Sequence, residues 1–164
     1  MLKDFNRDLA IGKRAEVIVY NLLSSLGYHV EDVSNNCLFY YSGDLKVIDK
    51  DKEYFIEVKN DSRIVDTGNV LCEIEVYYKN SGYYGKGNMD SDCDIYTVVS
   101  EVDSKVYFID FSILKKIYKY GEYKEIEHKQ QTTYCYLLPI GVIKKMGGLI
   151  GVVDYSENDL KGVA

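Results

Sequence analysis

Two runs with an apolar residue at every second position, 44–49 and 54–59, constrain the fold of this chain more than any other feature. A period of two is typical of strands with one buried face, and the short charged segment between the runs favours a hairpin. A loop with an even number of residues places Leu45 and Val47 on the same face as Ile56. A buried face selects this register, because a shift by one residue would mix the apolar and polar faces.

The same register brings Asp44 beside Glu57 and Lys59 on the opposite face of the hairpin. Glu57 and Lys59 point the same way, since residues two apart on a strand share a face. Two close carboxylates repel each other unless a cation lies between them. Mg²⁺ prefers oxygen ligands and keeps several waters, and a lysine can position the attacking water or stabilise charge on phosphoryl oxygens. Hydrolysis of a phosphodiester requires these elements together.

The remainder of the chain predicts a mixture of helices and strands. Residues 10–27 have apolar side chains at the i, i+3, i+4 spacing of a helix that ends near Gly27. We expect Ser112 to cap a second helix that ends near Gly121, and residues 142–146 to form a helical turn. Further strands are expected at residues 28–33, 38–41, 95–100, 105–111, 132–138 and 149–155. This order of elements predicts an α/β or α+β fold.

The segment after the hairpin is less regular. Asp61 and Arg63 are expected to be turn residues, and residues 70–78 are apolar enough for a strand or a helix. Residues 80–94 are expected to form a long loop, of the kind that is often functional or mobile. Within this loop, residues 82–87 suit a flexible DNA contact, because tyrosines stack on bases and lysine contacts phosphate.

Length and composition narrow the class of protein. A chain of 164 residues, 46% hydrophobic and 28% charged, is expected to form a single globular domain over residues 1–164. No apolar run approaches the ~18 residues of a membrane span, and the charged N-terminus lacks the apolar core of a signal peptide. Four scattered cysteines without a C-x-x-C pair disfavour a zinc site or a disulfide framework. We therefore expect free thiols, a cytoplasmic location and no membrane partner.

The formal net charge of −6 bears on the partner. It counts against a passive nucleic-acid binder, which normally has a basic face. It does not count against an enzyme whose carboxylates hold cations, because a bound metal reverses the local field. Candidates for a local basic patch are Lys115, Lys116, Lys119, Lys124, Lys144 and Lys145. A solvated helix face explains each of these lysines as well.

The hairpin and the helix before it resemble a known nuclease pattern. The pattern consists of Gly43, Asp44, twelve further residues, Glu57, Val58 and Lys59. It resembles the PD-(D/E)XK nuclease superfamily, most closely the Holliday-junction resolvases and related small phage or restriction-type nucleases. The helical segment 12–16 resembles the glycine-lysine start with which those proteins place a glutamate, here Glu16, on the first helix. Gly43 stands where the superfamily has proline.

The resemblance implies a restriction-endonuclease-like α/β fold with a mixed central β-sheet flanked by helices. It implies that Asp44 and Glu57 are metal ligands, helped by the carbonyl of Val58, and that Lys59 is the catalytic lysine. The implied activity is Mg²⁺-dependent endonucleolytic cleavage of DNA, with Mn²⁺ as a substitute, on branched DNA or on the DNA of phages and mobile elements. Similar small nucleases often act as homodimers on two strands.

Two further glutamates are candidate site residues. Glu16, an accessory ligand or water-holder by resemblance, lies at the edge of the apolar stripe on a helical wheel, where it could lean toward the site. A plain position on the helix surface explains Glu16 nearly as well. Glu73 lies in a segment with a faint similarity to some small members of the superfamily, and is a candidate accessory residue. Glu75 competes with Glu73 because both would lie on the same face of a strand.

Two other classes of function compete with the nuclease. One is a catalytically silent module on the nuclease fold that binds nucleic acid or protein. The other is an acidic decoy that mimics DNA and binds a DNA-processing protein, which the net charge of −6 suits. Neither alternative needs Asp44, Glu57 and Lys59 together. The simplest competing explanation of the hairpin is a solvated face with a weak Glu57–Lys59 ion pair.

Overall fold

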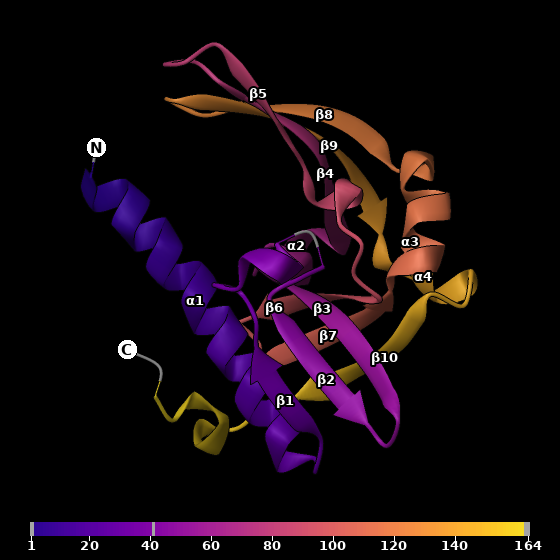
Figure 1. The fold of residues 1–164 in the computed structure, drawn as a ribbon. Coiled ribbons are helices and arrows are strands. Elements are labelled where there is room, and N and C mark those ends of the chain that lie inside the picture. The colour runs from indigo at the N-terminus through magenta and orange to yellow at the C-terminus, as the bar shows by residue number, and fades with distance from the viewer. Residues whose placement is uncertain (1, 41, 163–164) are drawn as a thin grey trace.

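The computed structural model describes residues 2–40 and 42–162, which form a mixed α/β fold (Figure 1). The α-helices are α1 (Leu2–Ser25), α2 (Ile64–Thr67), α3 (Phe111–Ile117) and α4 (Ile140–Lys145). The strands are β1 (His29–Asp32), β2 (Leu45–Asp49), β3 (Lys52–Asn60), β4 (Asn69–Tyr78), β5 (Tyr83–Lys86), β6 (Ile95–Ser100), β7 (Lys105–Asp110), β8 (Glu122–Glu127), β9 (Gln131–Pro139) and β10 (Leu149–Asp154). Short 3-10 helices are η1 (Cys37–Phe39), η2 (Asn88–Asp90), η3 (Tyr118–Tyr120) and η4 (Glu157–Leu160).

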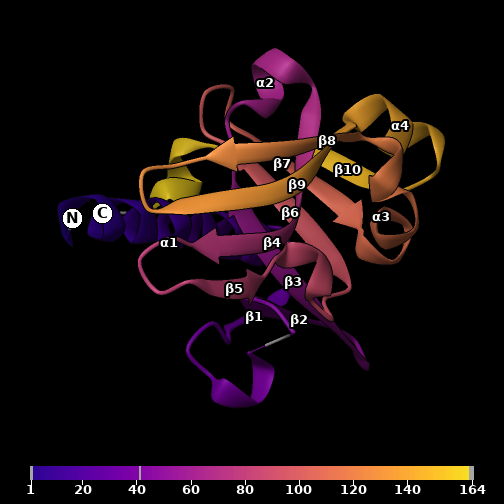
Figure 2. The ribbon, with the colours of Figure 1, turned by 90° about the horizontal axis from the view of Figure 1, so that it is seen from above.

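The strands form two sheets. One has six strands in the order β1-β2-β3-β6-β7-β10, and the other has four in the order β5-β4-β9-β8. In the six-stranded sheet β3 and β6 run parallel, while the other neighbouring pairs are antiparallel. The larger sheet is therefore mixed, as the resemblance implies. The four-stranded sheet is antiparallel throughout and crosses over the larger one (Figure 2).

Each face of the six-stranded sheet has its own apolar core. On one face α1 covers the sheet, and Ile18 packs in a cluster with Ile56 and Val99. On the other face the four-stranded sheet and α3 enclose a second cluster that includes Val98 and Leu114. Strand β6 contributes to both cores, because successive side chains of a strand point to opposite faces.

The β2–β3 hairpin has the register that the sequence predicts. Leu45 pairs with Ile56, and Val47 pairs with Tyr54. A two-residue turn joins the strands, and Lys50 in this turn has the positive φ of 57° that such turns favour. The uninterrupted apolar face of the hairpin thus selects one pairing.

The other predicted elements agree in type more than in their boundaries. Helix α1 begins at Leu2 rather than at residue 10, and it ends at Ser25. The strands predicted around residues 28, 95, 105, 132 and 149 are present as β1, β6, β7, β9 and β10, and residues 70–78 lie in strand β4. The helical turn predicted at 142–146 is α4. Among the described residues, no helix is long and apolar enough to cross a membrane.

The strand predicted at residues 38–41 is wrong. Residues 37–39 form the 3-10 helix η1, because the side chain of Asn36 accepts a hydrogen bond from the N–H of Leu38 at 3.0 Å. This Asx-type contact offers the backbone a tight turn in place of a strand. Residue 41 lies outside the described residues.

Two further segments differ from the expectation. The predicted loop 80–94 contains strand β5, which pairs with the end of β4. The sequence pattern predicts no strand at β8. The side chains of β8 are mostly exposed and charged, because it lies at a sheet edge, and they form no apolar pattern. The cap of α3 is Asp110 rather than Ser112. Oδ1 of Asp110 accepts from the N–H of Ile113 at 3.2 Å and from the Ser112 hydroxyl at 2.6 Å.

Candidate functional site

Asp44 lies directly before β2 and is held by three hydrogen bonds. Its N–H donates to the carbonyl of Ile56 at 2.8 Å, and its carbonyl accepts from the N–H of Val33 at 3.0 Å. Its side-chain Oδ2 accepts from the N–H of Val58 at 2.8 Å. The last of these bonds fixes the carboxylate near the C-terminal end of β3.

Gly43 makes this placement of Asp44 possible. Its φ is 139°, and a Cβ atom at this position would lie 2.6 Å from the carbonyl oxygen of Ile56. Proline, whose ring holds φ at about −65°, cannot adopt this backbone conformation. The backbone at this position therefore requires glycine and excludes proline.

Glu57 and Lys59 form an ion pair on one face of β3. Nζ of Lys59 lies 2.7 Å from Oε1 of Glu57. The side chain of Glu57 is 15% exposed and that of Lys59 is 36% exposed. The pair is thus less solvated than the strand face that the simplest competing explanation assumes.

Burial and repulsion make the cluster electrostatically unusual. Burial raises the pKa of Asp44 to about 7, and the charges of Glu57 and Glu16 act in the same direction. The N–H of Val58 and the ammonium of Lys59 oppose this rise in the pKa. Burial lowers the pKa of Lys59, but neighbouring carboxylates, Glu57 first, outweigh burial and hold that pKa above its usual value. Negative charge in the cluster is therefore only partly compensated.

Glu16 lies close to the cluster but already has a cationic partner. Its Oε2 lies 2.5 Å from Nζ of Lys13, which also contacts Asp32 at 3.0 Å. Glu16 lines a cavity of about 370 Å³ together with Asp44 and Lys59. The structure thus brings Glu16 to the edge of the site, as expected, with Lys13 as an additional neighbour.

A β-bulge separates the two competing glutamates of β4. The pairing of β4 with β9 shifts register between Glu73 and Glu75, so the two side chains do not share an environment. Glu73 is half-buried and lines a cavity of about 170 Å³ with Lys59, whereas Glu75 is exposed. Burial raises the pKa of Glu73, and the charge of Lys59 partly opposes this. Glu73 is therefore the glutamate of β4 that lies near the site.

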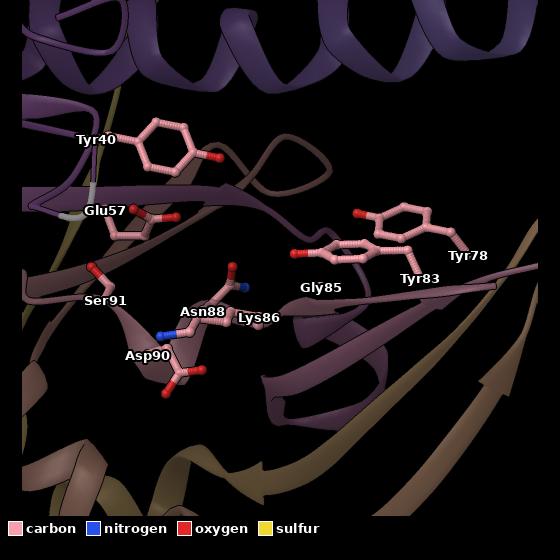
Figure 3. Close-up of a pocket in the computed structure, with 10 residues that line it drawn as sticks. Tyr40, Glu57, Tyr78, Tyr83, Gly85, Lys86, Asn88, Asp90 and Ser91 are labelled. Atoms are coloured by element: carbon pink, nitrogen blue, oxygen red, sulfur yellow. The ribbon is translucent and has the colours of Figure 1, made fainter. Parts of the chain in front are cut away.

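A third cavity adjoins the cluster from the side of β5. Its volume is about 380 Å³, and its lining includes Glu57, Tyr40 and Asn88 (Figure 3). Asn88 donates to the hydroxyl of Tyr96 at 3.3 Å, and that hydroxyl donates to the carbonyl of Leu71 at 3.2 Å. The sequence singles out Glu57 and the segment 82–87, which supplies Tyr83 and Lys86 to this lining. It does not single out Tyr40 or Asn88, because these two residues come from separate segments and form no local pattern.

Glu101 links helix α1 to the end of β3 through two hydrogen bonds. Glu101 accepts from Nε of Arg14 at 2.6 Å and from Nδ2 of Asn60 at 2.7 Å. Asn60 directly follows Lys59 and lines the cavities on both sides of it. This contact therefore holds the backbone next to the lysine.

The turn residues and the lysines of the candidate basic patch lie outside the cluster of Asp44, Glu57 and Lys59. Arg63 pairs with Asp61 at 3.0 Å, as expected of turn residues. The lysines of the candidate basic patch are distributed over α3, η3, β8 and α4. Lys124 lies on a strand rather than on a helix face, and pairs with Glu122 at 2.6 Å.

The donor atoms of the cluster suit a hard divalent cation. Within the described residues, no group of three or more His, Cys, Asp and Glu side chains is arranged to hold a metal. The expected ligand set is smaller, with the two carboxylates of Asp44 and Glu57 and the carbonyl of Val58. All are oxygen donors, which Mg²⁺ prefers, and Mg²⁺ is usually bound by only one or two carboxylates with waters in the other positions. The negative charge around Asp44, which is only partly compensated, also favours a cation.

Comparison with family models, with curated proteins and with solved structures finds no match for this chain. The chemistry that the site supports follows from its geometry. That geometry consists of Asp44, Glu57 and Lys59 at the end of β3, with one cavity on each side and a third toward β5.

Proposed function

We propose that this protein is a Mg²⁺- or Mn²⁺-dependent deoxyribonuclease of the PD-(D/E)XK type that hydrolyses phosphodiester bonds within DNA on a restriction-endonuclease-like fold. One observation carries the proposal: Asp44 is held by the N–H of Val58 beside the Glu57–Lys59 ion pair. The mixed sheet with α1 packed on one face supports it. The proposal also includes a cytoplasmic location and homodimers that act on two strands.

Each residue of the cluster has a chemical task in this proposal. Asp44, Glu57 and the carbonyl of Val58 would hold the divalent ion. The chemistry that such an ion supplies is activation of a water and neutralisation of phosphoryl charge. The ammonium of Lys59 donates to the attacking water or to a phosphoryl oxygen, and Glu57 orients it through their 2.7 Å contact. Glu16 and Glu73 act as accessory groups at the edges of the site.

Neither a silent module nor an acidic decoy would use Asp44, Glu57 and Lys59 together. Either would tolerate the loss of Asp44 or Glu57 without a change in its own binding. The net charge of −6 suits the decoy, but a decoy has no use for a carboxylate such as Glu57, which is 15% exposed and pairs with Lys59. The geometry therefore favours the nuclease.

Removing one ligand charge at a time tests the proposal. Asp44→Asn and Glu57→Gln keep the shape of the side chains, so the fold should persist while affinity for Mn²⁺ falls and cleavage is lost. Affinity is measured by calorimetry. Cleavage is measured on plasmid, single-stranded, flap and four-way-junction DNA.

Matched controls lie at the other end of the same hairpin. Asp49→Asn and Glu53→Gln remove the same charges from exposed positions of β2 and β3, and should leave both readouts unchanged. Mn²⁺ affinity that is equal in wild type, controls and ligand variants would defeat the proposal.

A further inference from the structure

The cavity of about 380 Å³ beside Glu57 has walls that suit an aromatic ligand (Figure 3). Its volume lies near the lower end of the ~300–1,000 Å³ that small-molecule sites occupy, which suits a group of nucleoside size. Glu57 forms part of one side, and the β4–β5 hairpin forms another. The cavity is therefore continuous with the proposed catalytic cluster.

Three tyrosines supply the aromatic surface. Tyr78 on β4 and Tyr83 on β5 are cross-strand partners, and their rings stack with centroids 6.4 Å apart and planes 18° apart. Figure 3 shows their hydroxyls directed toward the side of Glu57, with Tyr40 across the cavity. Tyr83 is 63% exposed and Tyr40 is 75% exposed, so a ligand can reach both side chains.

Two glycines in the neighbouring backbone shape this wall. A Cβ atom on Gly85 would lie 3.0 Å from Cε2 of Tyr78, so the glycine leaves room for that ring to lie across β5. A Cβ atom on Gly87 would lie 2.3 Å from the carbonyl oxygen of Glu73, so only glycine lets the chain approach β4 this closely. The spacing of glycines and tyrosines in this segment thus maintains the cavity.

The polar lining distinguishes between a base and a phosphate. The carboxylates of Glu57 and Asp90 and the ammonium of Lys86 line the cavity. Two negative charges against one positive charge disfavour a phosphate group. Base edges are uncharged and carry both donors and acceptors, as do the amide of Asn88 and the hydroxyl of Ser91 in the lining. Nδ2 of Asn88 also donates to the Tyr96 hydroxyl at 3.3 Å, and the Ser91 hydroxyl accepts from the N–H of Cys93 at 3.1 Å. The cavity therefore fits a neutral, planar ring with polar edges better than it fits an anion.

We propose that this cavity binds an unpaired nucleobase of a single-stranded nucleic acid, next to the bond that is cut. The inference rests on the proposed nuclease function, because Glu57 belongs to both the cavity and the catalytic cluster. Bases stacked within a duplex cannot present their faces to tyrosine, so single strands and flaps bind in preference to blunt duplex. DNA and RNA offer the same stacking faces, so both are used as probes.

The test measures base stacking without cleavage. Single-stranded DNA and RNA oligonucleotides that contain 2-aminopurine are titrated in EDTA, and fluorescence quenching reports stacking while anisotropy reports affinity. Tyr83→Ser should weaken binding of the preferred strand by about 5- to 150-fold and remove quenching, since stacking of one base on an aromatic side chain is worth that much. Tyr83→Phe should retain both, because it keeps the ring.

Tyr84→Ser is the matched control. Tyr84 is the next residue on β5 and points to the opposite face, where it contacts Tyr77 with ring centroids 4.7 Å apart. This variant should bind and quench as the wild type does. Equal affinity of Tyr83→Ser, Tyr84→Ser and wild type overturns the inference, as does equal binding of blunt duplex and single strand.

Cleavage of the same oligonucleotides in Mn²⁺ distinguishes the nuclease proposal from the base-binding proposal. If the wild type quenches through Tyr83 but cuts no strand, the nuclease proposal fails and the base site stands. If the wild type cuts and Tyr83→Ser cuts and binds equally well, the base site fails and the nuclease proposal stands.

Discussion

The β2–β3 and β4–β5 hairpins both border the candidate site, but they are specified in different ways. In β2–β3 the pairing is continuous from Leu45–Ile56 to Asp49–Lys52, and one face lies in the core beneath α1. In β4 the pairing with β9 shifts after Glu73, and the side chains of the paired strand β5 are mostly exposed. The structure of the β2–β3 hairpin follows from a repeating sequence pattern. The structure of the β4–β5 hairpin depends on local backbone irregularities.

The difference shows what a sequence pattern can position. A buried face that is continuous makes a shift of register costly, so it also fixes the polar side chains on the opposite face. A bulge adds one residue to a strand and reverses the expected faces beyond it. The carboxylates and lysine of the first hairpin can therefore be placed from the sequence, whereas the tyrosine cavity of the second cannot.

The largest expected effect concerns the backbone of the regular hairpin. Gly43→Ala puts a Cβ atom 2.6 Å from the carbonyl oxygen of Ile56 in a residue with φ of 139°. We expect a loss of at least about 2 kcal/mol in the free energy of unfolding, because strained backbone alone costs ~1–3 kcal/mol. Chemical denaturation measures this loss.

The control for this prediction is a glycine without crowding. Gly141 lies in α4, and a Cβ atom there would have no neighbour within 4 Å. Gly141→Ala should be neutral or stabilise by up to about 1 kcal/mol, as expected in a helix. Equal stability of Gly43→Ala and wild type would show that the alternating pattern alone determines this hairpin.

A smaller change in stability is expected for substitutions at Glu73 and Glu75 on β4. Burial raises the pKa of Glu73, so its charged form destabilises the fold at neutral pH, and Glu73→Gln should raise the free energy of unfolding. Glu75 is exposed, and Glu75→Gln should stay within about 0.5 kcal/mol of wild type. Denaturation of both variants at pH 7 measures the difference. Identical shifts would mean that the bulge does not separate the two side chains.

The fold was predictable where periodicity is continuous. The apolar spacing of α1 and the alternation of β2 and β3 each identify an element and its buried face. Asp44, Glu57 and Lys59 follow from the same alternation, because the pairing of Leu45 with Ile56 determines where they lie. This part of the site needs no information beyond the pattern of one hairpin.

The remaining features depend on single hydrogen bonds or close approaches. The contact from Asn36 to Leu38 forms η1 where a strand is expected. Asp110, rather than Ser112, caps α3 because its oxygen reaches the N–H of Ile113. Tyr40, which lines the tyrosine cavity from a distant segment, has no signal in the local sequence. Such features arise only when the chain is folded.

Lys59→Ala tests most directly whether the cluster is catalytic. The variant and wild type are compared in thermal midpoint, DNA binding in Ca²⁺ and DNA cleavage in Mn²⁺, with Lys52→Ala as a control at an exposed position of the same strand. Removal of one well-placed electrostatic donor typically lowers the rate about 100- to 1,000-fold. We expect such a loss in Lys59→Ala with DNA binding retained, and incomplete rescue by Lys59→Arg, since a planar guanidinium cannot replace a compact ammonium. A folded, DNA-binding Lys59→Ala protein that cuts at the wild-type rate would contradict the proposed mechanism.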